Sequence, residues 1–180
     1  MKSLMVGTGK INITPPVGTY LAGYAGRKGP CIGIHDELYS KALVLKKDGE
    51  SFAIVTNDLT GLDKETGEEI RNLIYKETKI PSSNIIITAS HTHSGPLTYL
   101  FRAGMGKPDR EYLNVLKKKI AGAVYIANRN LKKAYIGIGK GRVRINVNRR
   151  GKISEGSLDL KPYPEGEVDE EVGVLKIVDE

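Results

Sequence analysis

Apolar and polar positions alternate with a period of two along much of the chain, which is typical of β-strands that bury one face. The predicted strands cover residues 4–14, 38–47, 51–58, 134–148 and 171–178. Between the second and third of these strands lies an Asp-Gly pair, which favours a tight hairpin turn. The segment 84–90, "NIIITAS", is continuously apolar and rich in β-branched residues. We therefore expect it to form a strand that is buried on both faces.

Two further segments carry apolar residues at helical spacing. Residues 63–78 place Ile70, Leu73 and Ile74 on one face, with acidic residues first and basic residues later, as the helix dipole favours. Residues 109–131 repeat the helical pattern. The order of these elements predicts an α/β fold, a single domain over residues 1–180 with a mixed β-sheet and flanking helices.

The composition excludes several classes of protein. Hydrophobic residues make up 39% and charged residues 27% of the 180 residues, and no apolar run approaches the roughly 20 residues of a transmembrane helix. The net charge of +7 is scattered except over 141–150, which lacks the aromatic residues of a single-strand-binding surface, so we expect no nucleic-acid partner. The single cysteine and the lack of a signal-peptide pattern predict a cytoplasmic protein.

Two of the three histidines, His91 and His93, lie in "ITASHTHSGPLTYL", directly after the predicted buried strand. Ligands bind at the carboxyl ends of strands in open α/β sheets. Two imidazoles placed two residues apart can face the same way, which suits one metal ion, or one metal and a substrate contact. The same pair can instead serve as a capping or core-satisfying group, so the spacing alone leaves both interpretations open.

Other residues can complete such a site. Asp58 ends the strand 51–58, and its carboxylate is a candidate partner for a metal-bound imidazole. The third histidine, His35, either joins the site or forms a hydrogen bond with Asp36. A zinc site usually takes three or four protein ligands, so the two neighbouring histidines do not complete one.

Several motifs together resemble those of a known family. They are "VGTGKINITPPVGTYLAGYAGR", "HDELYSKALVL", "IVTNDLTGL", "NIIITASHTHSGP", "NVNRR" and "EVGVLKIVD". Their order resembles that of the neutral/alkaline non-lysosomal ceramidases, over essentially the whole chain. "HTHSGP" after an apolar strand is the most specific of these motifs.

The resemblance implies a zinc-dependent amide hydrolase that cleaves the N-acyl bond of ceramide into sphingosine and a fatty acid. It implies that His91 is a zinc ligand and that His93 contacts the substrate or the transition state. It also implies that Arg149, in the "NRR" stretch, makes a polar contact to the substrate. Zinc suits this chemistry because it polarises a carbonyl and lowers the pKa of bound water to roughly 7.

The loop after the histidines, residues 97–106, is the candidate lipid-facing segment. Tyr99 and Phe101 are its candidate substrate-binding residues, in keeping with an N-acyl amide or lipid-like substrate. The alternative is that these aromatic side chains anchor the loop to the core.

The resemblance places a further histidine, a glutamate and a tyrosine of the zinc shell downstream of residue 180. We therefore expect residues 1–180 to form an N-terminal portion of the family fold that carries part of the active site and is inactive alone. The alternative is a non-catalytic binding or assembly module. That module would keep the fold, bind no metal and form a homo-oligomer through an exposed apolar patch.

Overall fold

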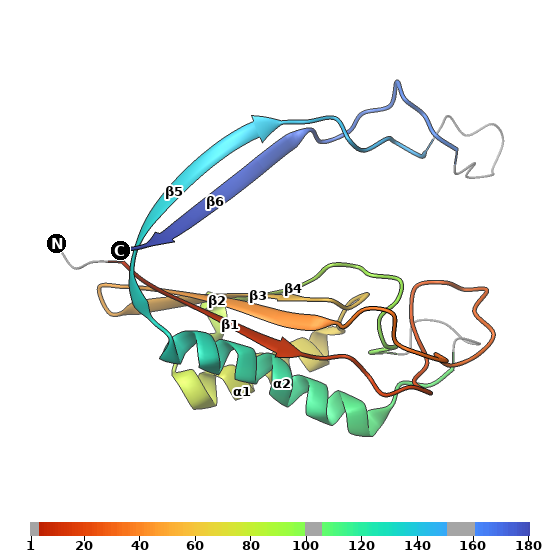
Figure 1. Ribbon diagram of the computed structural model, residues 1–180, viewed down its shortest axis with the longest axis horizontal. Coiled ribbons are helices and arrows are strands. Elements are labelled where there is room, and N and C mark those ends of the chain that lie inside the picture. Colours follow the sequence, from red (N-terminus) through yellow and green to blue (C-terminus); the bar gives the residue numbers. More distant parts are fainter. Residues whose placement is uncertain (1–3, 100–105, 151–160) are drawn as a thin grey trace. The chain divides into compact units, whose positions relative to one another are not determined.

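The computed structural model of the protein describes residues 4–99, 106–150 and 161–180 (Figure 1). The chain divides into two compact units, one that ends at Lys133 and one that runs from Ala134 to Glu180. A continuous strand, β5, crosses the boundary between the two units. β5 therefore contributes residues to both units.

The first unit is built on four strands in the order β4-β3-β2-β1. These are β1 (Met5–Asn12), β2 (Tyr39–Lys47), β3 (Glu50–Asn57) and β4 (Ile85–Ala89). β1, β2 and β3 pair antiparallel, whereas β3 and β4 pair parallel. The expected hairpin is confirmed, because Asp48 (φ 52°) and Gly49 (φ 92°) both take the positive φ of a tight type I′ turn. The predicted mixed sheet is therefore present.

Two helices lie on one face of this sheet, α1 (Lys64–Thr78) and α2 (Arg110–Arg129), as Figure 1 shows. Each helix is preceded by an aspartate that caps it: the side chain accepts a hydrogen bond from a backbone N–H in the first turn. Asp63 Oδ1 lies 2.7 Å from Thr66 N, and Asp109 Oδ1 lies 3.0 Å from Tyr112 N. A short 3₁₀ turn, Ser82–Asn84, leads into β4. Both predicted helices are confirmed to within two residues.

α2 packs unusually close to β1 because β1 carries glycine where the helix crosses it. A Cβ added at Gly7 would lie 2.0 Å from the Ala127 carbonyl oxygen, and one at Gly9 would lie 2.1 Å from that of Ala123. The core between sheet and helices is mostly apolar, with the buried hydroxyl of Tyr112 donating to the Ile13 carbonyl. Its largest buried members include Ile13, Val44, Val55, Leu59, Ile70, Ile74, Ile80, Leu116, Ile120 and Val124.

β4 differs from the prediction for residues 84–90. Within the described strands it has a partner on one side only, because it ends the strand order of the sheet. Ile85 is buried against the helices, but Ile86 on the opposite face is 56% exposed. The prediction of burial on both faces is therefore wrong, since both helices cover the same face of the sheet.

The second unit is an antiparallel ribbon of β5 (Lys132–Arg142) and β6 (Glu171–Asp179). The first two residues of β5 belong to the first unit, where they pair with Val6 and Met5. The predicted strand 134–148 ends early, at Arg142. Beyond Arg142 the two segments are joined largely by side chains. Arg144 and Asn148 donate hydrogen bonds to backbone carbonyls of residues 164–167.

Neither of the two helices in the described parts of the chain is long and apolar enough to cross a membrane.

Candidate functional site

The parallel strands β3 and β4 end at the same edge of the sheet, and one buried asparagine joins their ends. Asn57 is the register partner of Ala89 and is 1% exposed. Its side-chain Nδ2 donates to the Thr88 carbonyl at 2.9 Å. Its backbone carbonyl accepts a hydrogen bond from Ser90 N at 2.9 Å. The chain that leaves β4 therefore starts from a fixed position.

His91 follows with a left-handed backbone conformation, φ 60°, which is uncommon for a residue other than glycine. Its Nδ1 lies 2.8 Å from the carbonyl oxygen of Thr60. Because a carbonyl only accepts, this hydrogen bond assigns the proton to Nδ1 and leaves the lone pair of a neutral ring on Nε2. Metal-bound histidines in proteins commonly use one nitrogen in this way to orient the other.

The loop after β3 and the histidine turn hold each other through side chains as well. Thr60 Oγ1 donates to the Thr92 carbonyl at 2.7 Å, and Thr98 Oγ1 donates to the Gly61 carbonyl at 2.6 Å. Gly95 is buried between the two segments, and a Cβ there would lie 3.3 Å from the Asp58 carbonyl oxygen. The two segments therefore form one well-packed edge of the first unit.

His93 lies beside His91. Their ring centroids are 5.0 Å apart with an interplanar angle of 66°. The His93 ring also meets the ring of Tyr24, with centroids 5.0 Å apart at an interplanar angle of 85°. The structure therefore brings together the two predicted histidines and adds a tyrosine from the loop after β1.

Asp58 lies at the same edge but makes its contacts elsewhere. Its Oδ2 accepts from the backbone N–H of Tyr39 at 2.9 Å, and its own N–H donates to the Tyr39 carbonyl at 3.0 Å. The oxygen that orients His91 is thus the Thr60 carbonyl. A carboxylate contact from Asp58 to a metal-bound imidazole stays a prediction.

The third histidine, His35, forms the hydrogen bond with Asp36 that was one of its two predicted alternatives. His35 Nδ1 lies 2.6 Å from Asp36 Oδ2, and the His35 side chain is 97% exposed. Both residues border a cavity of about 420 Å³ next to the histidine turn, which Thr92 and Ser94 also line. This volume falls in the range of small-molecule sites.

The remaining predicted residues lie in different places. Tyr99 is described and partly buried, and its hydroxyl faces Gly61. Phe101 lies outside the described residues. Arg149 is exposed and belongs to the second unit, next to Asn148, whose carbonyl accepts from Tyr163 N at 2.7 Å.

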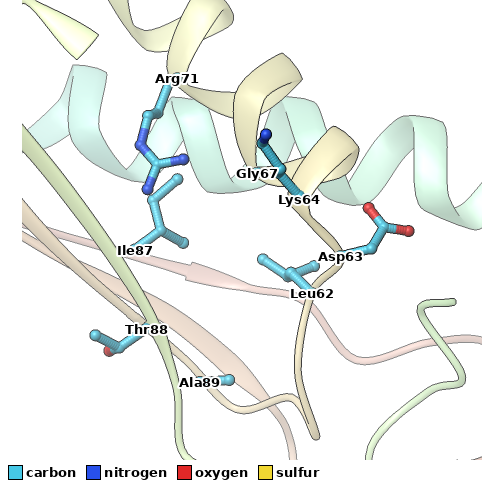
Figure 2. A pocket seen from close by; sticks show the side chains of 8 residues that line it. All are labelled: Leu62, Asp63, Lys64, Gly67, Arg71, Ile87, Thr88 and Ala89. Atoms are coloured by element: carbon cyan, nitrogen blue, oxygen red, sulfur yellow. The ribbon is translucent and has the colours of Figure 1, made fainter. Parts of the chain in front are cut away.

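A second hollow, of about 430 Å³, lies between the start of α1 and β4 (Figure 2). In Figure 2 the Arg71 side chain extends from α1 towards Ile87. Two polar side chains that line this hollow are already engaged in hydrogen bonds. Asp63 caps α1, and Arg71 Nε donates to the Ile85 carbonyl at 3.3 Å. The histidine turn is therefore the stronger candidate site.

The donor set at the histidine turn fits part of a zinc site. Neutral imidazole nitrogen is a preferred zinc ligand, and His91 presents Nε2 with its other nitrogen already bonded. No group of three or more histidine, cysteine, aspartate or glutamate side chains suited to a metal occurs within residues 4–99, 106–150 and 161–180.

The family model for the N-terminal part of neutral/alkaline non-lysosomal ceramidases matches residues 4–180. The chain belongs to this family. The resemblance inferred from "HTHSGP" and the motifs around it is thereby confirmed.

Two curated ceramidases match with similar strength. Neutral ceramidase 3 of Arabidopsis thaliana is 24% identical over 188 residues, which cover 98% of this chain and 25% of the plant protein. Neutral ceramidase of Pseudomonas aeruginosa is 24% identical over 186 residues, which cover 96% of this chain and 27% of the bacterial protein. The chain therefore spans about a quarter of the length of these ceramidases.

Solved ceramidase structures share the fold. The crystal structure of the Pseudomonas aeruginosa neutral ceramidase matches with a TM-score of 0.77 at 22% identity, over 99% of this chain and 30% of that one. A ceramidase complexed with C2 matches with the same TM-score at 21% identity, over 99% of this chain and 29% of that one.

Sequence reasoning did not single out Thr60, Tyr24 or Arg27. The Thr60 contact uses a backbone carbonyl, which every residue type has, so no side-chain signal was available for it. Tyr24 and Arg27 lie inside the opening family motif, "GYAGR", which marked them as part of the resemblance but gave them no role.

Proposed function

We propose that this chain contributes the N-terminal part of a zinc-dependent hydrolase of N-acyl amide bonds, with ceramide as the model substrate and sphingosine and a fatty acid as products. Membership of the ceramidase family supports the reaction class. The hydrogen bond from His91 Nδ1 to the Thr60 carbonyl carries the metal part of the proposal, because it leaves Nε2 as the coordinating atom.

In this proposal His91 holds the metal, and further ligands come from polypeptide that the structure does not describe. Bound zinc would polarise the amide carbonyl and lower the pKa of a bound water. His93, beside His91, contacts the oxygen that gains negative charge. A well-placed donor in that role contributes on the order of 3 kcal/mol to transition-state stabilisation. Arg149 is assigned to a polar contact with the substrate, and Tyr99 and Phe101 to the acyl chain, on family resemblance.

The test is zinc content and hydrolysis in the natural polypeptide that contains this sequence. His91→Asn is the sharper variant, because asparagine tolerates the left-handed backbone of residue 91 better than alanine does. We expect His91→Asn to lose zinc and the release of fatty acid from an N-acyl amide. His35→Asn, which removes an exposed imidazole bonded to Asp36, is the matched control and should keep its zinc. Full zinc occupancy in His91→Asn would contradict the proposal.

A second candidate function is a non-catalytic assembly module. The observation that favours it is the apolar surface of the β5–β6 ribbon, where Ile138, Val174 and Leu175 are exposed. Exposed apolar patches of this kind commonly mark interaction surfaces. Light scattering, which gives the oligomeric state, and elemental analysis, which gives the zinc content, together separate the two candidates. A zinc-free homo-oligomer supports the module, whereas a zinc-loaded monomer contradicts it.

A further inference from the structure

The loop after β1 runs alongside the histidine turn and is joined to it through the backbone. Ala22 N donates to the Gly95 carbonyl at 3.0 Å, and Leu97 N donates to the Tyr20 carbonyl at 2.8 Å. Leu21 and Pro96 form an isolated antiparallel bridge between these two bonds. Residues 20–27, here called the β1 loop, are thus held next to His93.

Gly23 allows the β1 loop to approach His93 closely. Its φ is +103°, a conformation that side chains rarely adopt. An added Cβ would lie 2.5 Å from both Cβ and Cγ of His93. Any side chain at this position would therefore displace the imidazole or the loop.

Tyr24, the next residue, packs edge-to-face against the His93 ring and is 58% exposed. The ring of Tyr24 thus has a direct ring contact with the imidazole although more than half of its surface is exposed. Edge-to-face contacts between rings have a defined geometry and add about 0.5–1.5 kcal/mol beyond the area that they bury. The ring of Tyr24 therefore restricts the orientation of the His93 ring, in addition to the contact that His93 makes with His91.

Arg27 connects the loop to the backbone of His93. Its Nη2 donates to the His93 carbonyl at 3.1 Å, and its Nη1 donates to the Ala22 carbonyl at 3.2 Å. The guanidinium carbon also lies 5.5 Å from the centroid of the Tyr24 ring. One planar group thus spans the carbonyls of both segments, which a lysine with a single nitrogen cannot reproduce.

We propose that Gly23, Tyr24 and Arg27 are positioning residues that fix the place and orientation of the His93 imidazole. Gly23 provides the space, Tyr24 packs against the ring, and Arg27 holds the backbone from which the ring projects. The consequence for catalysis rests on the proposed function, since His93 contacts the substrate only there. The geometric part stands by itself and can be tested on the metal-free protein.

The first test follows the imidazole protons by NMR. The chain has only three histidines, so His35→Asn and His91→Asn assign all three rings. We expect Tyr24→Leu to remove the ring-current shift of the His93 protons, and Tyr24→Phe to keep it. Tyr125→Leu, which removes another exposed tyrosine from α2, should leave the His93 signals unchanged. Unchanged His93 signals in a folded Tyr24→Leu variant would overturn the proposal.

Arg27→Met gives a second, independent variant, because it removes both donors and keeps a side chain of similar length. We expect its His93 signals to move or broaden, and those of Arg27→Lys to move less. If both Arg27 variants leave His93 unchanged, Arg27 is not a positioning residue.

A kinetic test separates positioning from general stability in the natural polypeptide. Because a displacement of about 1 Å at a reacting group can cost on the order of 100-fold, we expect Tyr24→Leu to lower kcat about 10- to 100-fold with little change in KM. Tyr24→Phe should restore kcat. If the protein proves not to be a hydrolase, the proposed function fails, while the NMR result still decides whether these residues fix His93.

Discussion

The two units differ in the burial of their apolar side chains. In the first unit Val44, Leu116 and Ile120 are completely buried between the sheet and its helices. In the second unit Ile138 is 81% exposed and Ile145 is 87% exposed. An isolated two-stranded ribbon is marginally stable at best in water. The first unit, which carries the histidine turn, therefore has its own core, and the ribbon does not.

The ribbon is apolar on both faces, which makes the difference sharper. Ile136 lies opposite Ile177 and Ile138 opposite Leu175, so these four side chains share one face. Val174, opposite Gly139, lies on the other face. Alternation in the sequence thus predicts the strands of both units equally well, but it does not show whether a strand finds a core.

Removal of a core side chain should distinguish the units most strongly. We expect Leu116→Ala to lower the free energy of unfolding by about 2–5 kcal/mol, because it leaves a cavity beneath the sheet. Ile138→Ala, a comparable truncation in the ribbon, should cost less than about 0.5 kcal/mol. Urea unfolding followed by circular dichroism measures both. Equal losses would mean that the ribbon is buried in solution.

Glycine-to-alanine changes give a second pair. Gly9→Ala should cost about 1–3 kcal/mol, because its Cβ would meet the backbone of α2. Gly139→Ala meets no atom within 4 Å and should leave the melting temperature unchanged or slightly higher. Thermal unfolding tests the pair, and a tolerated Gly9→Ala would show that α2 can move away from β1.

The first unit should also lose stability in alkali, chiefly through one buried tyrosine. Burial raises the pKa of Tyr112 above the ordinary value of 10.0, and its hydroxyl donates to the Ile13 carbonyl at 2.5 Å. Since the folded state holds this proton more tightly, its contribution is complete below pH 10 and falls by about 1.4 kcal/mol per pH unit above it. Unfolding measured between about pH 9 and about pH 11 should show this loss. Tyr112→Phe should remove most of this loss and Tyr125→Phe should not; an unchanged profile in Tyr112→Phe would assign the loss elsewhere.

Ion pairs should give the smallest difference. Lys117 is 20% exposed at its side chain and bonds Glu69 across the two helices at 2.5 Å, whereas the Lys140–Glu171 pair of the ribbon is largely exposed. We expect Lys117→Ala to cost up to about 1 kcal/mol and Lys140→Ala to cost almost nothing. Urea unfolding at low and high salt checks the order, and the reverse order would contradict it.

The helices and the hairpin were predictable because their signals are local. Asp63 and Asp109 cap helices that begin at the next residue, and Asp48-Gly49 forms the expected turn. The exposure of Ile86 was not predictable, because it depends on which face of the sheet the helices cover. The early end of β5 depends on side chains such as Asn148, which bond distant carbonyls.

The site was predictable only in outline. Placement of His91 and His93 at a strand end followed from the apolar run before them. The contacts that orient them come from segments far away in the sequence, through a carbonyl at Thr60 and a glycine at residue 23. The pattern of apolar residues within one segment does not predict contacts between segments that lie far apart in the sequence.

The same separations have a consequence for the order of folding. The β2–β3 hairpin joins neighbouring segments and can close within about 1–10 μs. By contrast, the Thr60–His91 bond spans 31 residues and the Arg27–His93 bond spans 66. Loop closure over such distances carries a larger entropic cost, so contacts of this kind form late. We therefore expect the imidazole pair to reach its final geometry only after the β2–β3 hairpin has closed.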